Sequence, residues 1–205
     1  KMSMDKAALA ILFIVILIIV NGIFSAGEFA IVSSRKSKIK ELMKTGKEKR
    51  SETLLEMKEN PERFLSAVQI GITLCGTLAS VIGGILSVQY IKPFIRQIPY
   101  IGVFDNTLSV VIMVAGLTYL FLVIGELVPK YIGINYKEKV ALSVAPFLHF
   151  IAKVFFVFVN FLSFSTLLVV KALNLKKGEE HIGEGEIKVL LEEGRRKGVF
   201  DETEE

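Results

Sequence analysis

One carboxylate, Glu126, stands near the end of an apolar stretch that begins at about Leu108 and holds no other charged residue. An ionisable residue inside a membrane-length segment is costly unless it has a partner, so it indicates a functional site. Pro129 follows three residues later and has no backbone N–H, so the carbonyl of Gly125 should lose its helical hydrogen bond. A carboxylate beside a free carbonyl is a pair of oxygen ligands of the kind that hard cations bind.

A second set of polar atoms lies near the end of the first apolar segment. Asn21 and Ser25 are four residues apart, so they occupy one face of a helix. For Ser25, cation binding and helix–helix packing are equally open, and Asn21 is a candidate residue of an ion pathway. Gly22 and Gly27 beside them favour close packing of a neighbouring helix.

The second apolar segment carries a polar stripe at spacings of three and four residues: Ser66, Gln69, Thr73, Thr77 and Ser80. Such a stripe is one helical face, and it should contact protein or water instead of lipid. It favours an ion pathway over interhelical hydrogen bonding, with Gln69 and Thr73 as candidate ligands and Thr77 as a pathway residue. Gly71 and Gly76 interrupt the same segment and could expose carbonyl oxygens.

The candidate residues of the three segments reach similar depths. At 1.5 Å per residue, Ser25 lies about 15 Å before Arg35 and Glu126 about 6 Å before Lys130. Gln69 and Thr73 lie about 9–15 Å beyond Arg63 by the same arithmetic. The oxygens could therefore converge on one cation, with the Gly71 and Gly125 carbonyls among them. A set of oxygens alone suits Mg²⁺ or Na⁺ and is poor for zinc or copper.

The composition predicts an all-α membrane protein in which these candidates lie at membrane depth. Hydrophobic residues make up 52% of the 205, and the charged residues crowd into 35–63 and 176–205. The net charge is +4, but the basic residues alternate with acidic ones and flank the apolar spans. This pattern does not indicate a nucleic-acid partner. A single cysteine, Cys75, excludes an internal disulfide.

Three transmembrane helices are predicted, at about 7–32, 64–90 and 108–128. Residues 33–63 carry ten Lys or Arg and six Glu, so the positive-inside rule places them in the cytoplasm. We expect a multi-pass protein of the plasma (inner) membrane with its N-terminus outside. Asn60 and Pro61 predict the start of the second span, and the apolar residues of 33–63 predict amphipathic helices broken near Gly46.

A fourth apolar stretch, 142–170, holds Pro146, His149 and Lys153, and ten acids and six bases follow it in 176–205. We expect a re-entrant or interfacial helix pair on the cytosolic side, bent near Pro146, with Lys153 reaching the interface. The expected domains are 1–175 in the membrane and 176–205 as a cytosolic acidic helical linker. A membrane enzyme is not indicated, because no Ser-His-Asp set, HExxH motif or P-loop is present.

Three motifs resemble the DUF21 transmembrane domain of the CorC/CNNM family of magnesium transporters, once described as hemolysin-like. They are Phe24-Ser25-Ala26-Gly27-Glu28, the run from Asn60-Pro61-Glu62-Arg63 to Gln69-Ile70-Gly71-Ile72-Thr73, and Gly125-Glu126-Leu127-Val128-Pro129-Lys130. The resemblance covers about residues 5–175. It implies three spans with a cytosolic belt of helices, a homodimer, and Mg²⁺ movement coupled to Na⁺. It also implies a cytosolic CBS-domain pair that would follow residue 205 in the full-length protein.

By motif position, the resemblance ties Ser25 and Glu126 to Mg²⁺. Many relatives have asparagine where this chain has Ile72 and Gly76, so Gln69, Thr73 or glycine carbonyls would have to substitute. Pro129 and Gly76 are expected in the pathway or gate. The leading hypothesis is a transporter that exports Mg²⁺ using a sodium gradient. The alternative is a membrane magnesium sensor or regulatory scaffold that binds the ion without moving it.

Overall fold

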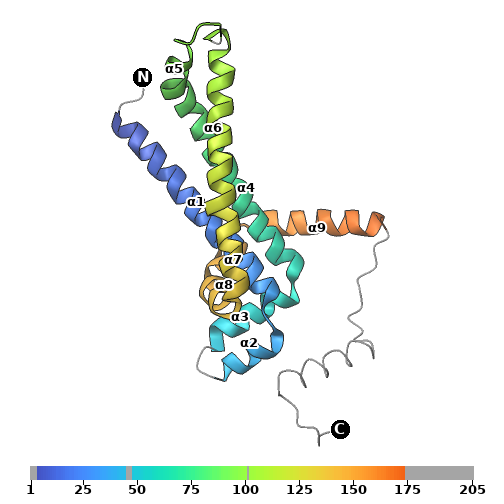
Figure 1. Ribbon diagram of the computed structural model, residues 1–205. Coiled ribbons are helices and arrows are strands. Elements are labelled where there is room, and N and C mark those ends of the chain that lie inside the picture. Colours follow the sequence, from blue (N-terminus) through green and yellow to red (C-terminus); the bar gives the residue numbers. More distant parts are fainter. Residues whose placement is uncertain (1–3, 45–47, 101, 174–205) are drawn as a thin grey trace, which may run out of the picture. The chain divides into compact units, whose positions relative to one another are not determined.

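The computed structural model describes residues 4–44, 48–100 and 102–173, and the regular structure in these ranges is helical throughout. Three helical stretches are long and apolar enough to span a membrane: Met4–Ser33, Pro61–Ile95 and Gly102–Asn135. They lie side by side in Figure 1 and confirm the predicted all-α membrane architecture. A fourth span would exist if the bent pair Lys137–Val154 and Phe156–Ala172 crossed as one.

The first span is one unbroken helix, α1 (Met4–Ser33), whereas the other two contain a wider turn. The second joins α4 (Pro61–Leu86) to α5 (Lys92–Ile95) through the π-helical turn η1 (Ser87–Ile91). The third begins with η2 (Gly102–Phe104) and joins α6 (Asp105–Leu122) to α7 (Val128–Asn135) through a second π-helical turn, η3 (Val123–Leu127). Such turns insert an extra residue into an α-helix and occur often at functional sites.

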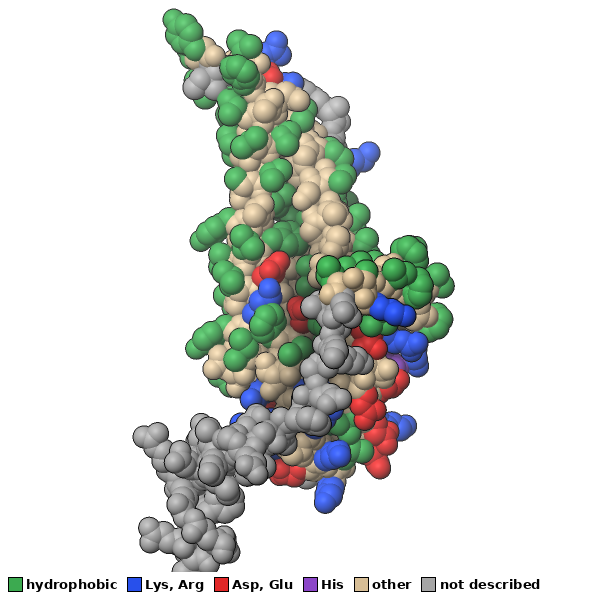
Figure 2. Space-filling view, turned by 90° about the vertical axis from the view of Figure 1, so that its right-hand side faces the viewer, with side chains coloured by type: hydrophobic (Ala, Val, Ile, Leu, Met, Phe, Trp, Pro, Cys, Tyr) green, Lys and Arg blue, Asp and Glu red, His purple; other side chains and the backbone are tan. Residues whose placement is uncertain are grey.

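The stretch between the first two spans forms α2 (Lys36–Met43) and α3 (Glu48–Glu59), which pack on each other. Their apolar faces, predicted from the sequence, point inward, because Ile39 and Leu54 are fully buried. Gly46, where the break was expected, lies outside the described residues. Figure 2 shows most of the Lys, Arg, Asp and Glu side chains in the lower part of the view and a few at its top, while the face along the spans is largely hydrophobic apart from a small acidic and basic group at mid-height.

Asn60 does precede the first residue of α4, and Pro61 occupies its first turn, as expected. However, the Asn60 side chain does not cap this helix. Its amide donates instead to the carbonyl of Glu56, which closes the preceding helix α3.

The fourth apolar stretch forms α8 (Lys137–Val154) and α9 (Phe156–Ala172), which meet at 88°. The expected bent pair is present, but the prediction of a bend near Pro146 is wrong. Pro146 lies inside α8, and the bend falls at Phe155, where φ −94° and ψ 22° leave the helical region. A proline removes only one donor from a helix, so neighbouring contacts can keep the helix continuous through it.

The chain divides into two compact units, Lys1–Ser165 and Thr166–Glu205. The predicted boundary near 175 and the acidic helical linker 176–205 lie outside the described residues. Within the first unit, α1 is the central helix. It packs against α4 at Phe24, against α8 at Gly27 and against the η3–α7 segment at Gly22.

Candidate cation-binding site

The Gly125–Glu126 stretch lies within η3, the π-helical turn of the third span. The N–H of Val128 donates to the carbonyl of Val123, five residues earlier, which is the spacing of a π-helix. Pro129 follows directly and cannot donate to the carbonyl of Gly125. The local sequence therefore widens the helix at the level of Glu126 and frees a carbonyl oxygen, as the sequence predicts.

The Gly125 carbonyl finds its partner on the first span. The side-chain amide of Asn21 donates to it over 2.9 Å, and Asn21 is 1% exposed. This contact fixes the orientation of the amide, because turning it over would set two oxygens against each other. The other amide atom, Oδ1, is buried and has no hydrogen-bond partner among the described residues.

Ser25, one turn further along α1, is fully buried, and its hydroxyl oxygen also has no hydrogen-bond partner in the described part of the chain. Seven other helical hydroxyls bond back to a carbonyl three or four residues earlier, whereas Ser51 of α3 is, like Ser25, buried without a partner in the described ranges. The seven are Ser66, Thr77, Ser80, Ser87, Ser109, Ser143 and Ser165. The Ser25 hydroxyl makes no such bond to a backbone carbonyl. An unpaired buried hydroxyl is destabilising, so such a group in a folded protein calls for an explanation.

Glu126 is partly buried and paired within its own helix. The amino group of Lys130 lies 3.1 Å from its carboxylate and 5.3 Å from the centre of the Phe29 ring on α1. Glu28, half-buried on α1, interacts electrostatically with both Lys130 and Glu126. Lys130 therefore forms an ion pair with Glu126, and Glu28 lies within electrostatic reach of both where α1 meets η3 and α7.

The polar stripe of the second span has a different position. Gln69, Thr73, Thr77 and Ser80 are exposed on α4 in the isolated chain. Gln69 donates to the Thr73 hydroxyl, and Thr77 bonds to the carbonyl of Thr73, so this part of the stripe is satisfied within its own helix. The structure brings none of the four into hydrogen-bonding contact with Ser25. They are left on a surface of the single chain.

The candidate glycines divide into packed and open positions. A Cβ on Gly71 would overlap the Phe24 ring of α1, whereas a Cβ on Gly76 would meet nothing within 4 Å. Pro129 is buried, and its ring contacts Gly22 of α1. The packing role favoured for Gly22 agrees with this contact. Gly71 likewise serves the close approach of α4 to α1.

The site thus contains the Gly125 carbonyl bonded to Asn21, two unpaired buried oxygens on α1, and Glu126 paired with Lys130 near a second carboxylate, Glu28. The oxygen chemistry can serve a hard cation. No group of three or more His, Cys, Asp or Glu side chains that could hold a metal occurs in the described ranges. Sequence reasoning missed Glu28 and Lys130, although the four-residue spacing of Glu126 and Lys130 signals a helical ion pair.

Fold and site together define an integral, multi-pass membrane domain with a polar site between its first and third spans. Residues 12–204 match the family model described as the cyclin M transmembrane N-terminal domain, CNNM. Because this match covers most of the sequence, the chain belongs to the CNNM transmembrane-domain family.

Relatives in bacteria share this domain. The chain is 39% identical over its whole length to UPF0053 protein sll0260 of Synechocystis, of which it covers 46%. It is 30% identical over 96% of its length to UPF0053 protein YugS of Bacillus subtilis, again covering 46% of that protein. Over 71% of its length it is 32% identical to the polyamine export protein of Haemophilus influenzae, covering 33% of it. The chain therefore spans less than half the length of these curated relatives.

Proposed function

We propose that this domain carries a cation across the membrane, with Mg²⁺ as the substrate and Na⁺ as the coupling ion. The observation that carries the proposal is the pair of buried oxygens, Asn21 Oδ1 and Ser25 Oγ, that lack hydrogen-bond partners among the described residues. Both lie on the α1 face that meets the π-helical turn with Glu126. Leaving two such oxygens unpaired is costly, and a passing cation would offset that cost.

Mg²⁺ fits the donor types of this site. It binds through one or two carboxylates and keeps several waters, so a hydroxyl, an amide oxygen and Glu126 need supply only part of an octahedron. Glu126 must exchange Lys130 for the ion, since Lys130 occupies the carboxylate in the structure. Binding would then break a weak internal ion pair and form a stronger contact to a divalent cation.

A polyamine is the second candidate substrate. One relative carries the name polyamine export protein, and the pair Glu28 and Glu126 offers two carboxylates for a chain of amines. Lys130, an alkylammonium, already occupies the place that such an amine would take. The two substrates make different demands, because a polyamine needs both carboxylates whereas Mg²⁺ needs the unpaired oxygens of α1.

The test is flux in proteoliposomes made with the full-length protein. We expect Ser25→Ala and Glu126→Gln to reduce Mg²⁺ flux strongly. Replacing Na⁺ by choline removes the sodium gradient and should abolish the flux that this gradient drives. Ser143→Ala is the matched control, because Ser143 is exposed on α8 and its hydroxyl bonds to the Lys139 carbonyl of its own helix. Unchanged Mg²⁺ flux in both site variants rules out this site. If the protein carries spermidine and this flux is lost in a Glu28 variant, the substrate is a polyamine and not Mg²⁺.

The same proposal includes a homodimer in the bilayer that acts with its own CBS domains in the full-length protein. The exposed polar stripe of α4 supports a second copy, since polar residues in a span normally face protein or water. The proposed orientation places α2 and α3 in the cytoplasm, because ten Lys or Arg lie in residues 33–63.

A further inference from the structure

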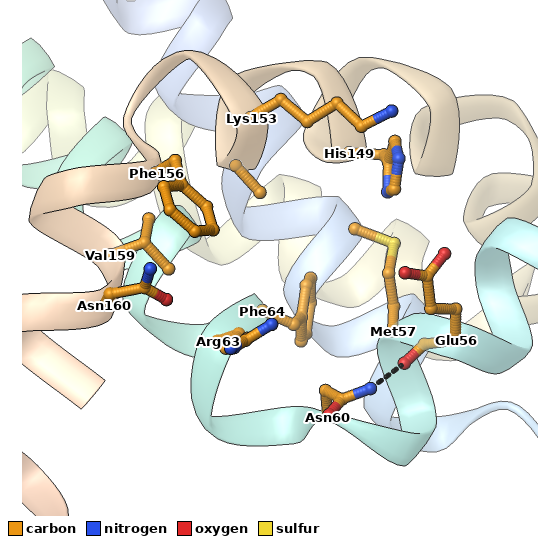
Figure 3. A pocket seen from close by; sticks show the side chains of 11 residues that line it. Glu56, Met57, Asn60, Arg63, Phe64, His149, Lys153, Phe156, Val159 and Asn160 are labelled. Carbon is orange, nitrogen blue, oxygen red and sulfur yellow. Dashed lines mark hydrogen bonds between the residues drawn. The ribbon is translucent and has the colours of Figure 1, made fainter. Parts of the chain in front are cut away.

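A pocket of about 270 Å³ lies apart from the cation site, where α3 and the start of α4 meet the corner between α8 and α9. Figure 3 shows Met57 and Phe64 projecting from α3 and α4 toward His149 and Lys153 on α8. Every residue that lines it belongs to the first compact unit. Arg63 is the third residue of α4, so the pocket lies where the second span leaves the membrane.

The charged residues of this pocket are mostly basic. Arg63, His149 and Lys153 line it, and Glu56 is the single acidic residue among the described residues that do so. The side chains of Arg63, His149 and Lys153 form no hydrogen bond or ion pair with another described residue. Arg63 and Lys153 are exposed, so both can reach a ligand from outside. The pocket therefore offers an anion two free cations and a histidine.

The floor of the pocket is apolar. Phe64 is 3% exposed and Val159 2%, and Phe156 at the start of α9 stands 55% exposed at the edge. From this edge α9 continues as an apolar helix with further exposed side chains, among them Phe158, Phe161 and Phe164. Such a surface is stable only against lipid or protein. A ligand of this pocket would thus have an anionic end and an apolar end.

We propose that this pocket binds an anionic phospholipid of the leaflet that faces α2 and α3. Its phosphate would lie between Arg63 and Lys153, and its acyl chains would follow Phe156 and α9 into the bilayer. The volume is slightly below the ~300–1,000 Å³ of pockets that enclose whole small ligands, which suits a headgroup whose chains remain outside. Basic pockets between membrane helices on the cytoplasmic side are known to select such headgroups.

The experiment uses the full-length protein in nanodiscs of equimolar phosphatidylglycerol and phosphatidylcholine. After extraction into mild detergent, native mass spectrometry measures the ratio of the two lipids that each protein retains. We expect the wild type to retain mainly phosphatidylglycerol, and Arg63→Gln or Lys153→Gln to lower that ratio by about fivefold each. These side chains form no hydrogen bond or ion pair with other described residues, so their replacement removes no internal polar interaction.

Two further variants distinguish lipid binding in the pocket from attraction of the lipid by basic residues elsewhere on the surface. Lys36→Gln with Lys40→Gln removes two bases from α2, on the same side of the membrane but outside the pocket, and should leave the ratio near the wild-type value. Ala152→Phe should fill the pocket without changing any charge, and should lower the retained phosphatidylglycerol. The proposal is overturned if the α2 pair lowers the ratio as much as the pocket pair does. It is equally overturned if the pocket variants leave the ratio unchanged, or if cross-linking shows a second copy of the chain in the pocket.

Discussion

Asn21 donates a hydrogen bond to the carbonyl of Gly125 across 104 residues of sequence, and this contact ties the first span to the π-helical turn of the third. Pro129 makes the contact possible, because it removes the donor that this carbonyl would have in a regular helix. The carbonyl is thereby satisfied from a neighbouring span. The unpaired Oδ1 of the same amide remains in the buried site.

Asn21→Ala should destabilise the domain by about 0.6–1.7 kcal/mol, from the mean to the largest value measured for hydrogen bonds between membrane helices. The substitution leaves the Gly125 carbonyl buried without its side-chain donor. Unfolding by denaturant in mixed micelles measures the loss. Asn135→Ala is the matched control, since Asn135 is exposed and bonds only to the Tyr131 carbonyl of its own helix. Equal losses in the two variants would show that the contact between the spans contributes nothing of its own.

Lys130→Met should tighten cation binding at Glu126 by about twofold, because a helical ion pair of four-residue spacing contributes roughly 0.3–0.5 kcal/mol. Lys130 and Glu126 are both about 30% exposed in their side chains, so solvent screens the pair and keeps this effect small. Titration calorimetry with Mg²⁺ measures the change.

The control for this prediction is a double-mutant cycle. In a Glu126→Gln background the lysine has no carboxylate to neutralise, so Lys130→Met should no longer change Mg²⁺ affinity. A gain that persists in this background would mean that Lys130 acts through its general positive charge, or through Glu28, and not through Glu126.

Lys58 joins the end of the first span to α3. Its amino group donates to the carbonyls of Ile31, Val32 and Ser34, which lie at the C-terminal end of α1, where a cation is favourable. We expect Lys58→Met to cost about 1.5 kcal/mol of stability, as for a hydrogen bond to a charged group. Hydrogen exchange at the Ser34 amide should accelerate. Lys40→Met, an exposed change on α2, should leave this exchange rate unaltered.

The sequence predicted those parts of the fold that depend on local patterns. Apolar length located the three spans, and the combination of Gly125 with Pro129 predicted a freed carbonyl. The partner of that carbonyl could not be predicted, because nothing in the sequence around Asn21 indicates which of two neighbouring spans it faces. Glu28 was overlooked for the same reason, since its relation to Lys130 exists only when α1 packs against α7.

Two other features have local causes. Proline suggested a bend at Pro146, yet the helix continues through it and turns at Phe155, where the residue type gives no signal. The pathway predicted from the spacing of the α4 stripe stays a prediction, and in the structure several of its polar groups bond within α4. Thr77 and Ser80 bond to carbonyls four residues back, and Gln69 bonds to Thr73. Back-bonding of this kind lets a hydroxyl face an apolar environment, so spacing alone does not identify a pathway.

Gly71→Ala should destabilise the domain by about 1–3 kcal/mol, because the new methyl group would overlap the ring of Phe24, which is 3% exposed and packs against Phe147. Thermal unfolding in detergent measures the loss, and Phe24→Leu should restore part of it by opening space. Gly76→Ala is the matched control on the same helix. A Cβ there meets nothing within 4 Å, so the higher helix propensity of alanine should make this variant neutral or more stable. Should Gly71→Ala be as stable as Gly76→Ala, α4 and α1 would not approach as closely as the structure shows.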